Sequence, residues 1–196
     1  MKYLINFQSY LIESLENNED RIHYSPTEII ELKSFSQSTE SDVKPIGLWY
    51  AFGENWNKFS DNFRENRYKY KVILKEGTES KILKITNMEE LLDFIKEYIE
   101  PTGFKFKGSR SQIKWNEVAK KYSGFEFLNY DRDNIRNFYR DEDLVNKYKS
   151  TLDNKLDMSK VDFYFYKGYY DWAHYFDIVS GCIWDSSIID SLEEIK

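Results

Sequence analysis

Two strand-like segments on either side of a polar loop constrain the fold of this chain more than any other feature. The first is Arg-Ile-His-Tyr at residues 21–24, which predicts a short strand that carries His23. The second is Gly-Leu-Trp-Tyr-Ala-Phe at residues 47–52, which is rich in the aromatic side chains that favour strands. Glycines bracket this second segment and permit close approach of another backbone. We expect the two strands to meet edge to edge, so that an imidazole and an aromatic ring converge at the mouth of a cleft.

The remaining patterns predict a mixed order of helices and strands. Apolar spacing and capping signals predict helices at residues 3–16, 27–32, 55–65, 88–99 and 113–122. Alternating or aromatic runs predict strands at residues 68–75, 81–85, 124–128, 161–166 and 182–184, with a turn or helix at 187–195. A Glu-Gly turn at 76–77 is expected to join two of these strands as a hairpin. Runs of two strands between helices favour an α+β fold over a doubly wound parallel sheet, and we expect residues 1–196 to form a single domain.

Composition places the chain among globular proteins. At 196 residues it is long enough for one domain with a substantial core. Hydrophobic residues make up 41% of the sequence, which excludes a disordered chain. Aromatic residues make up 18%, which predicts a core built largely from rings. The net charge of -6 argues against non-specific binding of nucleic acid, because such binding relies on a surplus of Lys and Arg.

The few cysteine and histidine residues exclude two classes of site. Cys182 is the one cysteine of the sequence, so an internal disulfide is excluded. With His23 and His174 it makes too small a set for a structural zinc site, and we expect no metal. A reducing compartment, the cytoplasm, is the expected location. Residues 1–9 are too polar for a signal peptide, and no apolar run approaches the ~20 residues of a membrane span.

Each candidate functional residue also has a purely structural interpretation. His23 either donates a hydrogen bond to a ligand hydroxyl as a neutral imidazole or satisfies its ring nitrogens locally. Strand alternation places Tyr50 and Trp49 on opposite faces, so one ring packs in the core while the other lines a cleft, or both pack in the core. Asp177, flanked by apolar residues, is either a surface carboxylate or one with a perturbed pKa.

Three further features have weaker functional interpretations. Cys182 is expected to be a buried small hydrophobe rather than a nucleophile paired with His174. Glu126 lies in a strand between two phenylalanines, so its side chain should point away from their rings. Residues 104–114 interleave Phe with Lys, which suits stacked bases and phosphates but equally suits an exposed strand with inward phenylalanines.

Five segments, in order along the chain, resemble motifs of the ADP-ribosyltransferase fold. They are Ile-His-Tyr-Ser at 22–25, Lys-Pro-Ile-Gly-Leu-Trp-Tyr at 44–50, Trp56, Ala-Lys-Lys-Tyr-Ser-Gly-Phe at 119–125 and Gly-Cys-Ile-Trp-Asp-Ser-Ser-Ile-Ile at 181–189. The resemblance implies a mixed or antiparallel split sheet with flanking helices. It also implies NAD-dependent transfer of ADP-ribose, with loss of nicotinamide.

The resemblance implies roles for individual residues. His23 matches the histidine that holds a ribose hydroxyl of NAD, and Tyr50 or Trp49 matches the ring that stacks on nicotinamide. The family usually has a glutamate in or just before its last strand, but Ser180 or the glycine after it stands there. The nearest upstream acid is Asp177. The implied catalytic residues are therefore His23, Tyr50 and Asp177, and the implied NAD-binding residues are His23, Tyr24, Ser25, Trp49, Tyr50, Trp56 and Ser180.

Three functions follow from these patterns. The first is transfer of ADP-ribose from NAD to a protein or nucleic-acid acceptor, with protein favoured, as by a viral or phage effector inside a host cell. The missing glutamate favours the second, a non-catalytic module that binds NAD or docks a partner through aromatic faces. The third is a nucleic-acid-binding protein that uses residues 104–121, against which the acidic net charge argues.

Overall fold

The computed structural model describes residues 20–40, 42–53, 68–98, 113–128 and 178–195. The strands are β1 (Arg21–Ser25), β2 (Leu48–Phe52), β3 (Tyr68–Leu74), β4 (Ile82–Ile85), β5 (Gly124–Phe127), β6 (Ser180–Ile183) and β7 (Ile189–Glu194). The helices are α3 (Met88–Tyr98) and α4 (Trp115–Ala119), with short 3-10 turns η2 (Glu79–Lys81) and η5 (Ser186–Ile188). The elements expected at 3–16, 55–65 and 161–166 lie outside the described residues, as do Trp56, His174 and Asp177.

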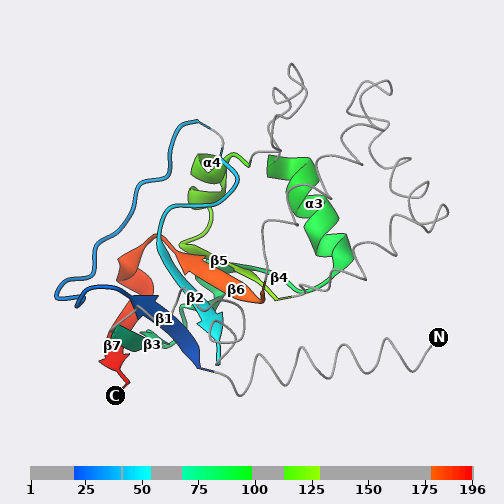
Figure 1. The fold of residues 1–196 in the computed structure, drawn as a ribbon. Helices are drawn as coiled ribbons and strands as arrows, with labels where there is room; N and C mark the ends of the chain where they lie inside the picture. The colour runs from blue at the N-terminus through cyan, green and yellow to red at the C-terminus, as the bar shows by residue number, and fades with distance from the viewer. Residues whose placement is uncertain (1–19, 41, 54–67, 99–112, 129–177, 196) are drawn as a thin grey trace, which may run out of the picture.

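The strands form one seven-stranded mixed sheet. Their order is β4-β5-β6-β2-β1-β3-β7. β4 and β5 are parallel, and the other neighbouring pairs are antiparallel. Figure 1 shows α3 and α4 beside the β4-β5-β6 part of the sheet, with β7 at the opposite end. The α+β class predicted from the mixed order of patterns is confirmed.

β1 and β2 pair at one end and then part. Their register joins Arg21 with Phe52 and Ile22 with Ala51. On its other side β1 pairs with β3 at four positions, and β2 pairs with β6 at four positions. The two strands therefore separate from His23 onward, while each stays bonded to its outer neighbour. The sheet thus diverges locally between β1 and β2, although its strand order is continuous.

The predicted hairpin over residues 68–85 is wrong, although its turn exists. Gly77 occupies the left-handed region with φ of 76°, which a glycine adopts without strain. After this turn η2 redirects the chain, so that β3 lies between β1 and β7 while β4 pairs in parallel with β5. A turn signal sets a local reversal of the chain, but it does not choose the strand partner.

The helix predicted at residues 27–32 is also wrong, because Ser25 makes a local turn instead of a helix cap. Its Oγ donates to the Thr27 carbonyl at 2.6 Å and accepts from the Thr27 N–H at 3.3 Å. The Ile29 N–H then donates to the Tyr70 hydroxyl at 3.0 Å. These bonds hold residues 26–36 as an extended strap, and Ile29 and Leu32 pack from it against the core.

The C-terminal segment differs from its prediction as well. Residues 187–195 were expected to form a turn or helix, yet η5 ends at Ile188 and the strand β7 follows. β7 pairs antiparallel with β3, with a register irregularity between Ile73 and Leu74. Ile189 is buried and Leu192 packs against the core, whereas Asp190 between them is exposed. The pairing with β3 and the alternating burial explain why this segment forms a strand instead of a helix.

One face of the sheet carries an apolar cluster. It consists of Leu48, Tyr50, Phe52, Val72, Ile82, Leu128, Ile183, Ile188 and Ile189, all buried. These residues come from strands at both ends of the sheet, so the sheet curls around them.

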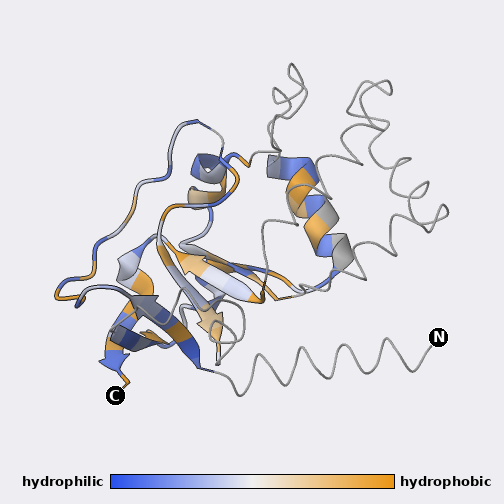
Figure 2. Cartoon of the chain, viewed as in Figure 1, coloured by the Kyte–Doolittle hydropathy of each residue, from blue (hydrophilic) through white to orange (hydrophobic). Residues whose placement is uncertain are grey.

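The other face of β5 packs against the two helices through aromatic rings. Ring centroids of Phe94 and Trp115 lie 5.6 and 5.3 Å from that of Phe125. The buried side of α3 consists of Leu91, Phe94, Ile95 and Tyr98. Figure 2 shows this helix with apolar and polar residues in alternating bands. The ring-rich core expected from composition is thus present between helices and sheet.

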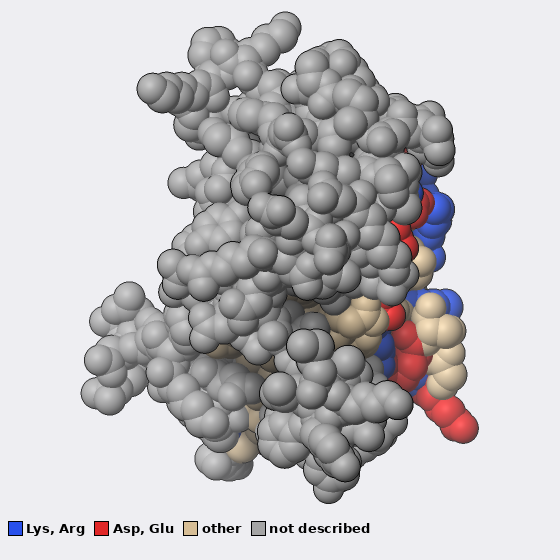
Figure 3. Space-filling model, turned by 90° about the vertical axis from the view of Figure 1, so that its right-hand side faces the viewer, with Lys and Arg blue, Asp and Glu red and all other residues tan. Residues whose placement is uncertain are grey.

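In the view of Figure 3, acidic and basic side chains of the described residues lie interspersed at one edge of the molecule.

Candidate ligand-binding cavity

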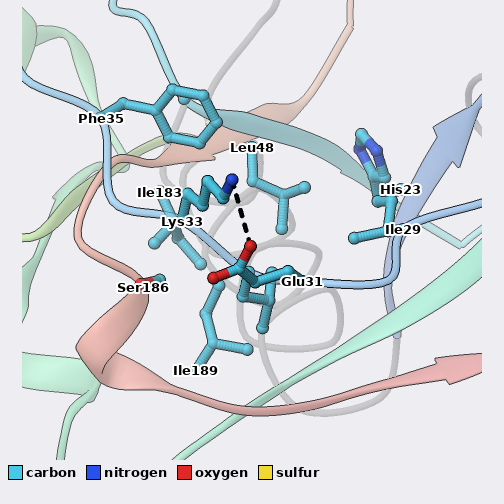
Figure 4. A pocket seen from close by; sticks show the side chains of 11 residues that line it. His23, Ile29, Glu31, Lys33, Phe35, Leu48, Ile183, Ser186 and Ile189 are labelled. Carbon is cyan, nitrogen blue, oxygen red and sulfur yellow. Dashed lines mark ion pairs between the residues drawn. The ribbon is translucent and has the colours of Figure 1, made fainter.

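A cavity lies where β1 and β2 part. Its volume is about 310 Å³, at the lower end of the range of about 300–1,000 Å³ typical of small-molecule pockets. The strap of residues 26–36 supplies much of its lining. The lining residues are His23, Ile29, Glu31, Leu32, Lys33, Phe35, Gly47, Leu48, Ile183, Ser186 and Ile189. Figure 4 shows His23 and Phe35 on opposite sides of this cavity.

His23 bridges the gap between the parting strands. Its Nδ1 lies 2.6 Å from the Trp49 carbonyl oxygen. Because a carbonyl oxygen only accepts, this geometry assigns the proton to Nδ1 and leaves Nε2 of the neutral ring as an acceptor. Burial lowers the pKa of His23 below its ordinary value of 6.5, and the hydrogen bond to Trp49 opposes this only in part. The ring is therefore neutral at pH 7, with a fixed tautomer.

Gly47 lets two strands close under the cavity. A Cβ at this position would lie 2.5 Å from the Ile183 carbonyl oxygen and 2.7 Å from Cys182 Sγ. No side chain fits there without moving the backbone of β6. The glycine noted in the sequence as permitting close approach is thus required for the packing that forms the cavity floor.

The strap is fixed at both of its ends. At one end the Ile29 N–H donates to the Tyr70 hydroxyl. At the other end the Phe35 N–H donates to the Trp184 carbonyl at 2.7 Å, and Ser34 Oγ lies 3.0 Å from Ser186 Oγ. These anchors hold the intervening residues across the cavity.

A buried polar network lies on the same face of the sheet as the cavity but outside its lining. The Tyr50 hydroxyl donates to Glu126 Oε1 at 2.6 Å, and Arg21 Nε donates to the same oxygen at 2.8 Å. Tyr50 and Glu126 are 0% and 1% exposed. Arg21 also donates to Glu79 at 3.0 Å, and Lys84 Nζ lies 3.8 Å from Glu126 Oε2. Burial, reinforced by the Glu126 charge, raises the pKa of Tyr50 well above its ordinary value, so the hydroxyl stays a donor.

Glu126 is the main residue whose role the sequence does not reveal. Its side chain points away from the flanking phenylalanines, as expected, but into a buried network instead of solvent. Oε2 accepts no hydrogen bond from the described residues. The local pattern gives no signal of this burial, because the two phenylalanines lie on one face of β5 and an acid between them is typical of a half-exposed strand.

Of the described residues that the resemblance singles out, His23 is the one that lines the cavity. His23 lines the cavity, whereas Tyr50 does not and has no exposed ring face. The hypothesis that these two groups line one pocket is therefore wrong for Tyr50. Trp49 lies on the opposite face of β2, where its Nε1 donates to the Pro45 carbonyl at 3.2 Å and Lys44 Nζ lies 5.4 Å from its ring.

The other expected NAD-binding residues that the structure describes lie outside the cavity lining. Tyr24 is on the opposite face of β1 from His23, with Lys69 Nζ 5.8 Å from its ring centroid. Ser25 is buried in the local turn described above. Ser180 is buried in β6, and its Oγ donates to the Ile178 carbonyl at 3.2 Å. The sequence did not point to the strap residues that line the cavity, because only tertiary contacts bring the strap to it.

The structure describes Cys182 and part of the basic segment 104–121, two features with weaker functional interpretations. Cys182 is fully buried and burial raises the pKa of its thiol, which suits the predicted small hydrophobe. Within residues 104–121, the segment 104–112 lies outside the described residues. Beyond it, Lys120 pairs with Glu117 at 2.7 Å and Lys121 pairs with Glu97 at 2.5 Å, so these two lysines are neutralised by acids.

The described residues lack two kinds of feature. They contain no group of three or more His, Cys, Asp or Glu side chains arranged to hold a metal ion. Within the same ranges, no helix has the length and apolar character needed to cross a membrane. Comparison with known proteins found no matching family model, no matching curated protein and no matching solved structure.

Proposed function

We propose that this protein binds NAD in the cavity between β1 and β2 and transfers its ADP-ribose to a macromolecular acceptor, protein rather than nucleic acid. The observation that carries the proposal is the His23 imidazole, held neutral by burial and fixed in one tautomer by Trp49. A ribose hydroxyl can donate to an acceptor of this kind. The ordered resemblance to ADP-ribosyltransferase motifs supports NAD as the ligand.

The size and lining of the cavity suit half of a dinucleotide. Its volume of about 310 Å³ suits a nucleoside-sized group. Leu48, Ile183 and Ile189 offer apolar surface for a flat ring, and His23 offers a hydrogen-bond acceptor beside it. In the proposed reaction the residues of this chain bind and orient NAD. An acid supports the positive charge that develops on the ribose, and Asp177 is our candidate for this acid.

Binding is tested by calorimetry with NAD. We expect heat of binding with the wild-type protein and a clear loss of affinity in His23→Ala, because the ribose acceptor is gone. Lys120→Ala is the matched control, since Lys120 lies on α4's C-terminal side and does not line the cavity. Absence of NAD binding by the folded wild-type protein would overturn the proposal.

Transfer is tested with labelled NAD and a cell lysate. We expect label to appear on a protein acceptor with the wild-type chain and to be lost with Asp177→Ala. Nicotinamide release in the same samples measures cleavage independently of the acceptor.

A non-catalytic NAD-binding or partner-binding module is the second candidate. One observation favours it: Glu126, a buried acid on the same sheet face as His23, is held by Tyr50 and Arg21 and is absent from the cavity lining. Ser180 or Gly181 stands where the family resemblance calls for a glutamate. NAD binding without nicotinamide release or labelled acceptor would support this candidate over the transferase.

A further inference from the structure

An ion pair on the strap lines the mouth of the cavity between β1 and β2. Lys33 Nζ is 3.1 Å from Glu31 Oε2, and both residues line the cavity with His23. Their side chains are 71% and 67% exposed, so the pair is open to solvent as well as to the cavity. Figure 4 shows the two side chains between His23 and Phe35.

The strap holds this pair at the cavity. Its backbone is anchored on one side by the bond of Ile29 to Tyr70 and on the other by the bond of Phe35 to Trp184. Leu32, between the two charged residues, packs against the core. Lys33 therefore cannot leave the cavity mouth without breaking these contacts, although its ammonium group can turn from one partner to another.

The charges of the lining suit an anionic group on the ligand. Of the described lining residues, Lys33 carries the one positive charge, because the pKa of His23 is lowered and its ring is neutral at pH 7. An exposed ion pair such as that of Glu31 with Lys33 contributes at most about 1 kcal/mol. A phosphate carries more charge than a carboxylate and forms charge-assisted hydrogen bonds with lysine. Lys33 can therefore exchange its Glu31 partner for a phosphate oxygen at little cost in free energy.

We propose that Lys33 binds a phosphate group of the ligand, and that Glu31 is the counterion it leaves on binding. The pair then selects phosphorylated nucleotides over the corresponding nucleosides. The inference rests on the proposed function for the dinucleotide class of ligand, but its phosphate contact is separately testable. The competing explanation is that the pair only stiffens the strap.

The test compares adenosine, AMP, inorganic pyrophosphate and NAD by calorimetry at low and high salt. For the wild-type protein we expect AMP and NAD to bind more tightly than adenosine, with affinity that falls as salt rises. In Lys33→Ala we expect about a fivefold loss of AMP and NAD affinity and a weaker salt dependence, with adenosine unchanged. In Glu31→Gln we expect a gain in affinity for the phosphorylated ligands.

Lys120→Ala is the matched control, because the Lys120–Glu117 pair is similarly exposed and lies outside this cavity. Thermal unfolding of each variant reports on the strap. If Lys33→Ala and Glu31→Gln lower the melting temperature yet leave the preference for AMP over adenosine intact, the phosphate contact is overturned and strap stiffening explains the pair.

The outcomes separate this inference from the proposed function. NAD binding that depends on His23 but not on Lys33 overturns the phosphate contact and leaves the proposed function standing. Pyrophosphate binding that depends on Lys33, without NAD binding, supports the phosphate contact and overturns the proposed function. Absence of binding by all four probes overturns both.

Discussion

Tyr50 donates a hydrogen bond of 2.6 Å to Glu126 across the strand that separates them. Tyr50 lies on β2 and Glu126 on β5, and both are register partners of Gly181 on β6. A Cβ on Gly181 would lie 2.5 Å from Tyr50 Cζ, so the tyrosine ring lies over the glycine. A buried carboxylate thus has its donor because the intervening residue has no side chain.

Removal of the Tyr50 hydroxyl should destabilise the protein. In Tyr50→Phe the buried Glu126 carboxylate loses one donor, and an unsatisfied buried group costs about 1–3 kcal/mol. Urea unfolding measures the change in free energy. Tyr68→Phe is the control, since Tyr68 is half-buried and its stacking on Tyr70 needs no hydroxyl. Equal stability of the two variants would contradict a structural role for the hydrogen bond.

A side chain at Gly181 should force Tyr50 out of place. We expect Gly181→Ala to destabilise the protein by about 1–3 kcal/mol, because overpacking a buried site has a cost of that size. The cost should shrink in a Tyr50→Leu background, where the clashing ring is absent. A thermodynamic cycle from four unfolding curves measures this coupling. Additive effects of the two changes would show that the clash is not with Tyr50.

Loss of Arg21 should leave Glu126 with too little positive charge nearby. Breaking one partner of a buried ion pair costs about 3–5 kcal/mol, and we expect the lower end for Arg21→Met because the Arg21 side chain is 18% exposed. The double variant Arg21→Met, Glu126→Gln should recover part of this loss, since no unpaired charge remains. Lys84→Met, 3.8 Å from Glu126 and 30% exposed, should cost much less. Unfolding by urea at neutral pH measures all three.

His23 should make stability depend on pH in one direction. Burial lowers its pKa in the folded protein below the ordinary value of 6.5. The unfolded chain therefore takes up this proton first as pH falls, so the contribution of neutral His23 is present above 6.5 and is lost as pH falls through the folded pKa. The difference in unfolding free energy between wild type and His23→Gln should shrink from about pH 8 to about pH 5. A difference that grows over this range would contradict the neutral ring.

Much of the sheet was predictable from local patterns. Residues 21–24 and 47–52 read as strands because they carry β-favouring side chains between polar or glycine-containing turns, and both are strands in the fold. The apolar side of α3 was predictable because apolar residues recur there at helical spacing. The helix expected at 27–32 is wrong although Pro26 and Glu28 fit a helix start, because the bond of Ile29 to Tyr70 holds the strap extended.

The candidate site was predictable only in part. The sequence singles out His23 because it is one of two histidines and stands in a predicted strand, and it does line a cavity. Tyr50 was assigned to the same cleft, yet it is buried in the network with Glu126. Strand alternation gives the face on which a ring lies, but not the partner that its hydroxyl meets across the intervening strand β6.

The amino-acid sequence by itself determined the α+β class, most of the strands, the amphipathic helix α3 and the burial of Cys182. These depend on periodicity and side-chain size, which act between near neighbours. The tertiary structure alone decided that β1 and β2 part at His23, that Tyr50 meets Glu126 over Gly181, and that Glu31 and Lys33 reach the cavity. Each of these contacts joins elements distant in sequence or depends on a strap held by such contacts, and no local pattern specifies which elements pack together.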